Sequence, residues 1–146
     1  MNESFEFVVK RPARAAFELL TDLKALAEAG QGHVRVSPVT GRPPTGPGSA
    51  LTIHLPLAGA QEVLCETVEW DEPRRCVRRF DIPDLPATLA LDFEEQPDGR
   101  TKILVNVSLE AKSMLYKMML PMLSQKIRAQ KEEAVREMQK RLDQDA

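Results

Sequence analysis

The stretch PMLSQKIRAQKEEAVREMQKRL, residues 121–142, decides the fold of this chain. Apolar residues recur in it at helical spacing among basic and acidic ones, which predicts a long amphipathic helix. Such a helix must bury its apolar side against another element, and the segment before it is the only partner long enough. We interpret the charged residues as a solvated face. The apolar positions are Leu123, Ile127, Ala134, Met138 and Leu142.

The segment before this helix reads as two short helices and a run of strands. Residues 3–10 alternate between apolar and polar, which predicts a half-buried strand. Apolar residues in 16–20 and 23–27 predict two short helices, with Pro12 in the first turn of one and Thr21-Asp22 capping the other. Alternation and turn signals predict further strands, which begin near His33 and run over 34–36, 51–55, 61–71, 75–82, 87–95 and 101–110.

Glycine and proline mark the turns between these segments. The loop GRPPTGPG at 41–48 is too rich in turn formers for a strand, and Asp98-Gly99 predicts a hairpin turn. Residues 113–120 are apolar nearly all round, and Pro121 is predicted to interrupt or restart the helix because it lacks the N–H of a helical hydrogen bond.

Size and charge narrow the class of protein. The chain has 146 residues, which fits one domain over 1–146, and its net charge of −2 argues against nucleic-acid binding. Cys65 and Cys76 lack metal-ligand spacing and are interpreted as small buried hydrophobes in a reducing cytoplasm. The start resembles no signal peptide, and no apolar stretch approaches membrane-spanning length. We therefore expect a cytoplasmic protein without an integral membrane segment.

Several phrases along the chain resemble one superfamily. These are FVV at 7–9 with RPA at 11–13 and AFELLTD at 16–22, GPGS at 46–49, VEWDEPRRC at 68–76, and DGRTKI at 98–103. In this order, over essentially the whole chain, they resemble the START/Bet v 1-like (SRPBCC) superfamily, and most closely its bacterial polyketide cyclase/dehydrase-like and lipid-transport members. The resemblance implies an α+β helix-grip fold. In that fold a bent antiparallel sheet of about seven strands wraps around the long C-terminal helix, with two short helices after the first strand.

The resemblance leaves the function open, because one fold hosts many functions. The first hypothesis is a non-catalytic protein that binds or carries a small hydrophobic molecule, such as a lipid, isoprenoid or aromatic polyketide, between sheet and helix. The alternative is a cyclase or dehydratase-like enzyme that uses the same cavity. A third is a protein-interaction module that resembles chaperone-ATPase activators. No cofactor is expected.

The hairpin around Asp71–Arg75 carries the sharpest prediction about a site. If Trp70 pairs with Cys76, Val68 faces Arg78 and Glu66 faces Phe80, which also pairs Leu64 with Ile82 and collects the apolar residues on one face. This register predicts that Glu66 and Arg78 both point into the cavity, where each needs a partner. Arg78 would then bind a carboxylate or other polar head of the ligand with Glu66 holding it, or the pair would lie at the rim and fix strand pairing.

Most of the remaining candidates are apolar. Ligand-binding residues are predicted to be Arg78, Glu66, Trp70, Phe80, Leu91, Phe93, Met119, Met122 and Leu123, in a cavity also lined by Phe7, Leu51, Ile53 and Val105. Glu66 is the only candidate acid or base, which favours binding over catalysis. His33 and His54 are interpreted as surface histidines, and neither a metal site nor a Ser-His-Asp arrangement is predicted.

The methionine-rich segment Met114–Met122 is apolar on more sides than one core face needs. We interpret it as a cavity wall or entrance, as a contact in a possible homodimer, or as ordinary core filling.

Overall fold

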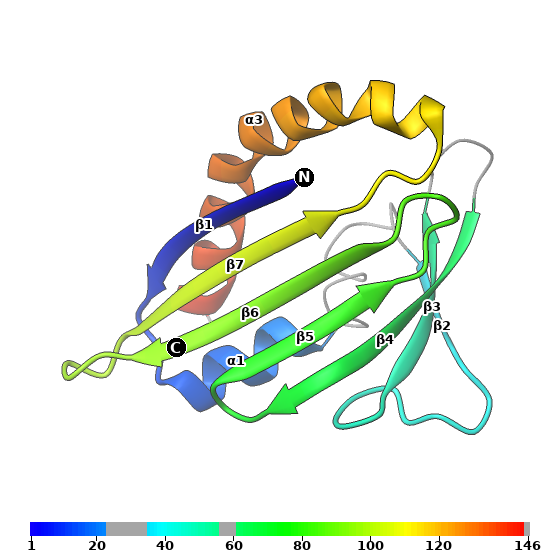
Figure 1. Ribbon diagram of the computed structural model, residues 1–146. Helices are drawn as coiled ribbons and strands as arrows, with labels where there is room; N and C mark the ends of the chain where they lie inside the picture. The colour runs from blue at the N-terminus through cyan, green and yellow to red at the C-terminus, as the bar shows by residue number, and fades with distance from the viewer. Residues whose placement is uncertain (23–34, 56–60, 145–146) are drawn as a thin grey trace.

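The computed structural model describes residues 1–22, 35–55 and 61–144 (Figure 1). Its elements are β1 (Asn2–Val9), α1 (Ala13–Thr21), β2 (Arg35–Pro38), β3 (Ala50–Leu55), β4 (Gln61–Asp71), β5 (Arg75–Phe80), β6 (Ala87–Glu95), β7 (Thr101–Leu109) and α3 (Met114–Gln144). The seven strands form one antiparallel sheet in the order β1-β7-β6-β5-β4-β3-β2. The predicted helix-grip architecture is confirmed, while the predicted second short helix and His33 lie outside the described residues.

Both described helices cover the same face of the sheet, which we call the inner face. Phe17 of α1 and Leu142 of α3 are fully buried in one core cluster with Leu91, Phe93 and Ile103 from the sheet. Phe17 also makes edge-to-face contacts with Phe93 and Trp70. The C-terminal half of α3 therefore lies in the same core as α1, and Figure 1 shows α3 following the β1 side of the sheet.

The N-terminal half of α3 packs on a second cluster. Its side chains Tyr116, Leu120 and Leu123 lie against Val63, Ile82, Leu85 and Ala87. The helix α3 is continuous from Met114 to Gln144 with Pro121 inside it, so it does not restart at the proline. The prediction of an interruption at Pro121 is therefore wrong. No helix in the described ranges is both long and apolar enough to cross a bilayer.

Polar contacts fasten α3 to the strand β1 and the residues after it. Glu3 accepts hydrogen bonds from Ser124 Oγ at 2.6 Å and from Arg128 Nε at 2.8 Å. Near the end of α3, the Lys10 backbone N–H donates to Asp143 and the Arg11 guanidinium donates to the Leu142 carbonyl. A cation at this end also complements the partial negative charge of a helix C-terminus.

A β-bulge in β4 sets which side chains point inward beside β5. Trp70 pairs with Cys76 as predicted, but Val68 is an extra residue between the pairs Glu69–Val77 and Thr67–Arg78. The bulge shifts every pair beyond it by one residue. Arg78 therefore faces Thr67 instead of Val68, and Glu66 faces Arg79 instead of Phe80, so this part of the predicted register is wrong.

Candidate functional site

Arg78 is a buried cation on the inner face of β5. Only 3% of its surface is exposed, although its neighbour Arg79 lies on the outer face in solvent. Its Nη2 donates to the Thr21 carbonyl at the end of α1 at 2.6 Å, and its Nε lies 3.4 Å from Thr67 Oγ1. The prediction that Arg78 points inward is confirmed.

Hydroxyl groups complete a polar cluster around Arg78. Thr67 Oγ1 and Ser49 Oγ are 2.6 Å apart, and the Thr67 N–H donates to the Ser49 carbonyl, which holds β4 against the start of β3. Thr21, Ser49 and Thr67 are all buried, so most of the buried polar side chains that the structure describes gather here. Pro44, Ala50, Leu51 and Cys65 pack around the cluster and leave no space there for a water molecule.

The cluster supplies Arg78 with neutral acceptors rather than a counter-charge. None of the ion pairs formed among the described residues includes Arg78. A buried charge without an opposite charge is costly, by several kcal/mol as an order of magnitude. Among the described residues, Arg78 is thus a desolvated guanidinium whose hydrogen-bond partners are neutral.

Glu66 does not provide that group. It lies on the outer face, where its carboxylate binds Arg79 Nη2 at 2.8 Å and Arg42 Nη1 at 3.3 Å. The predicted pairing of Glu66 with Arg78 inside the cavity is therefore wrong, and its physical cause is the bulge at Val68. Val68 and Leu64 also leave the predicted inner face, and Val63, Cys65 and Thr67 take their places.

The two cysteines lie on the same inner face and are both buried, as predicted. Desolvation raises the pKa of Cys65 to about 11, although the nearby positive charge of Arg78 acts in the opposite direction. Desolvation also raises the pKa of the Cys76 thiol. Near neutral pH both are thiols rather than thiolates, so neither is an activated nucleophile.

A groove of about 500 Å³ adjoins the Arg78 cluster. It is lined by Glu18, Thr21, Asp22, Pro44, Thr45, Gly46, Pro47, Trp70 and Glu72. The Thr21 carbonyl accepts the hydrogen bond from Arg78, and Thr21 also lines the groove. Pro44 borders both the groove and the Arg78 cluster. Trp70 therefore lies on the wall of a groove that ends beside the buried guanidinium.

The inner face also carries half-buried apolar side chains. One row across the strands pairs Thr67 with Arg78, Arg78 with Leu89, Leu89 with Val107, and Val107 with Glu3. Leu89 and Val107 are only partly buried, although both contact the main core cluster. The row thus runs from a buried cation over half-buried apolar side chains to a carboxylate that is bonded to α3.

The predicted apolar site residues divide into three groups. Leu91 and Phe93 are buried in the core cluster, where they pack against other side chains. Phe80 and Leu123 are half-buried around the second cluster, and Met119 is half-buried on α3. Met122 is 65% exposed on the side of α3 away from the sheet, so its prediction as a cavity wall is wrong.

Thr21, Ser49 and Thr67 were missed as site residues from the sequence. Ser49 belongs to the GPGS phrase that resembled a fold signature, but periodicity alone gives it no role. Thr67 points inward only because of the bulge. The sequence of β4 did contain a hint of this arrangement. Pairing of Cys65 with Leu51 and of Val63 with Ile53 puts apolar residues on one face of β3 and β4. This choice is as consistent with alternation as the predicted pairing of Leu64 and Val68 with β5.

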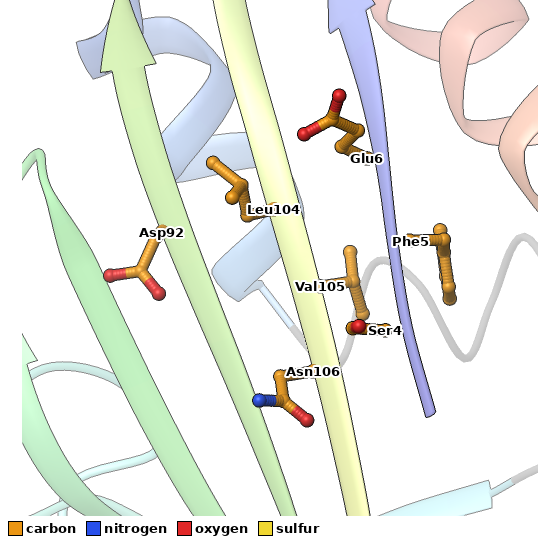
Figure 2. A pocket seen from close by; sticks show the side chains of 7 residues that line it. All are labelled: Ser4, Phe5, Glu6, Asp92, Leu104, Val105 and Asn106. Carbon is orange, nitrogen blue, oxygen red and sulfur yellow. The ribbon is translucent and has the colours of Figure 1, made fainter. Parts of the chain in front are cut away.

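A second depression, of about 450 Å³, lies mainly on the outer face of the sheet (Figure 2). Ser4, Glu6, Asp92, Leu104 and Asn106 line it, with Phe5 and Val105 behind them. Its carboxylates are already paired, Asp92 with Arg75 at 2.7 Å and Glu6 with Lys102 at 3.4 Å. We expect this polar, open surface to bind an apolar molecule poorly.

Neither the described histidine nor the acidic residues and cysteines indicate a catalytic or metal site. His54 lies on the outer face, where Nε2 is 2.9 Å from Ser37 Oγ and Nδ1 is 3.5 Å from Glu62, so its predicted outward position is confirmed. The described part of the chain gathers no group of three His, Cys, Asp or Glu side chains that could hold a metal ion.

Comparison with known proteins identifies the fold. No protein-family model matches the sequence, and no curated protein matches it. Among solved structures, a START superfamily protein from Mycobacterium smegmatis is 13% identical, with a TM-score of 0.74 over 99% of both chains. The ZhuI aromatase/cyclase from Streptomyces sp. R1128 is 13% identical, with a TM-score of 0.75 over 97% of this chain and 93% of its own. An HSP90 activator from Plasmodium falciparum is 18% identical, with a TM-score of 0.57 over 80% and 78% of the two chains.

The chain thus has the helix-grip fold of START/Bet v 1-like proteins, and the resemblance predicted from the sequence is confirmed at the level of the fold. Identities between 13% and 18% to these three structures show the architecture alone.

Proposed function

We propose that this protein binds a small amphipathic molecule, with an apolar body and an anionic head, on the inner face of its sheet. The observation that carries the proposal is Arg78, a buried guanidinium whose described partners are a carbonyl and a hydroxyl. An anionic head that reaches Arg78 from the adjoining groove would add a charge-assisted hydrogen bond, which none of the described residues gives Arg78. The structural neighbours, among them a START superfamily protein and an aromatase/cyclase, agree with a ligand-binding role.

The apolar body of the ligand would lie over Leu89 and Val107. These side chains follow Arg78 in the same cross-strand row and are only half-buried, so a ligand would remove further apolar surface from water. Burial of apolar surface contributes about 25 cal/mol per Å² before the costs of ordering the ligand. Three strand spacings, or about 14 Å, separate Arg78 on β5 from Glu3 on β1. This distance limits the length of a ligand that lies across the row. The ligand class is therefore that of a fatty-acid-like or aromatic carboxylate.

The alternative of a cyclase or dehydratase-like enzyme depended on Glu66 as the acid or base in the cavity, and the structure does not support that role. Glu66 is held on the outer face by two arginines, so it does not reach a ligand on the inner face. A cyclase-like activity would then depend on the shape of the binding site and on other groups. Binding or carriage is the function that the arrangement of Arg78, Leu89 and Val107 supports best.

One observation favours an interaction role beside ligand binding. Met114, Met118 and Met122 are exposed on the side of α3 away from the sheet. Because these side chains point away from the sheet, on which the ligand is proposed to lie, the two roles do not compete. A homodimer through this segment remains a prediction, which a measurement of the molar mass in solution tests. The single domain over 1–146 and the cytoplasmic location also remain predictions.

Native mass spectrometry of the purified protein tests the proposal, with Arg78→Met and Arg79→Met as a matched pair. We expect the unmodified protein and Arg79→Met to carry the same small molecule, which denaturation releases. Arg78→Met should be depleted of it. Equal retention by Arg78→Met, in a variant whose circular dichroism is unchanged, would contradict the role of Arg78.

A further inference from the structure

The outward side of α3 carries an apolar stripe that the core does not use. Met114 and Met118 are each 73% exposed, and Leu115 and Met122 are each 65% exposed. Their spacing places them together on one side of the helix, and we call these four residues the Met stripe. Exposed apolar side chains that gather in one patch mark a contact surface more often than scattered ones do.

The rest of α3 shows that the stripe is local. At the same level of the helix, Tyr116, Leu120 and Leu123 already bury the inward side against the sheet, so the stripe is a second apolar side. Further along, the outward side becomes charged, with Glu132, Glu133, Arg136 and Lys140 all exposed. The apolar patch therefore belongs only to the first half of the helix.

The charged residues in the segment that carries the stripe all have one sign. Residues 111–131 contain five basic residues and no acidic one, although the whole chain has a net charge of −2. Lys112, Lys117 and Lys126 are exposed and join no ion pair among the described residues. Arg128 is bonded to Glu3, yet 67% of its side chain stays exposed. The stripe thus lies within a positive region of an acidic protein.

We propose that the Met stripe docks this protein on the surface of an anionic lipid bilayer. A convex helix face with flexible apolar side chains and flanking lysines inserts at the boundary of headgroups and acyl chains, where the lysines meet anionic headgroups. This inference goes beyond ligand binding and does not depend on Arg78. Docking on a bilayer would also place the proposed ligand-binding protein next to the membrane, in which amphipathic molecules dissolve.

Two other occupants fit the charges and the composition less well. A second copy of the chain would bring the basic regions of both copies together, and like charges repel. The centre of a protein–protein interface is usually rich in tryptophan, tyrosine and arginine, and the stripe contains none of these residues. A bilayer requires no specific partner for each side chain.

Co-sedimentation with lipid vesicles tests the proposal. The probes are vesicles of phosphatidylcholine alone and vesicles of roughly 3:1 phosphatidylcholine to phosphatidylglycerol. The stripe variant is Met118→Asp with Met122→Asp, and both positions are exposed, so the fold should tolerate them. The control is Thr40→Asp with Asn106→Asp, which adds the same charge at exposed positions outside the stripe and outside residues 111–131.

We expect the unmodified protein and the control to bind the anionic vesicles and not the neutral ones. Binding should weaken when NaCl rises from about 50 to about 500 mM, because salt screens exposed charges. The stripe variant should lose at least about tenfold in affinity, since it replaces inserted side chains by anions. Three results would overturn the proposal: no binding by the unmodified protein at low salt, equal loss in the control, or a stripe-dependent dimer without vesicle binding.

Discussion

Arg78 and Glu3 lie at opposite ends of one cross-strand row on the inner face of the sheet, with Leu89 and Val107 between them. Arg78 is buried against α1, whereas Glu3 is bonded to the middle of α3. The row therefore joins the two helices through the sheet, with a cation at one end, a carboxylate at the other and half-buried apolar surface between. It supplies both the electrostatic and the apolar part of the proposed binding site.

The hydroxyl of Thr67 should stabilise the fold through Arg78. In Thr67→Val, the Arg78 Nε and Ser49 Oγ lose their partner inside a buried cluster, although the volume of the side chain hardly changes. We expect a loss of about 1–3 kcal/mol in the free energy of unfolding, measured with urea. The control is Thr52→Val on the outer face of β3, which should change it by less than about 0.5 kcal/mol. Equal effects of the two variants would show that the cluster does not stabilise the fold.

The space over Val107 should decide ligand affinity. In Val107→Trp, the larger side chain occupies the half-buried row where the apolar body is proposed to lie. We expect at least about tenfold weaker binding of dodecanoate, together with a melting temperature within about 2 °C of that of the unmodified protein. The control Leu104→Trp makes the same kind of change on the outer face of β7 and should bind normally. A strongly destabilised Val107→Trp would mean that the core already fills this space.

Glu3 should make stability depend on acid pH. The hydrogen bond from Ser124 is the largest cause that lowers its pKa below the ordinary value of 4.5, and the charge of Arg128 acts in the same direction. A carboxyl with a lowered pKa in the folded state stabilises the protein above its unfolded pKa, and this stabilisation is lost as pH falls through the folded value. Below about pH 4.5 the unmodified protein should therefore lose more stability than Glu3→Gln does.

Urea unfolding at several pH values between about 3 and 7 measures that difference. Glu94→Gln removes an exposed carboxylate on β6 and serves as the control, with the same acid sensitivity as the unmodified protein. If Glu3→Gln also keeps this sensitivity, the bond between β1 and α3 does not contribute.

The fold was predictable because several independent patterns agreed. The apolar spacing from Leu123 to Leu142 predicted the gripping helix, and the turn residues in 41–48 and at Asp98-Gly99 separated the strands. The Trp70–Cys76 pair and the inward Arg78 also follow from alternation. These predictions succeeded because side-chain period and turn chemistry are local properties.

The rest of the site could not be predicted, because it depends on one extra residue. Alternation has a period of two, so the bulge at Val68 exchanges the faces of all residues before it in β4. Glu66 and Thr67 change places for this reason. The prediction for Met122 was wrong for a different reason. In a helix segment that is apolar on all sides, the sequence does not show which side contacts the sheet, because tertiary packing determines that side.

The central claim is that Arg78 binds the anionic head of an apolar ligand, and calorimetric titration of dodecanoate and dodecanol tests it most directly. The two molecules share an apolar chain and differ in head charge. We predict that the unmodified protein prefers dodecanoate by about 1.5–3 kcal/mol, or roughly 10- to 150-fold. Arg78→Met should abolish this preference and retain binding of dodecanol, whereas Arg79→Met should keep it. An equal preference in Arg78→Met and the unmodified protein would contradict the claim.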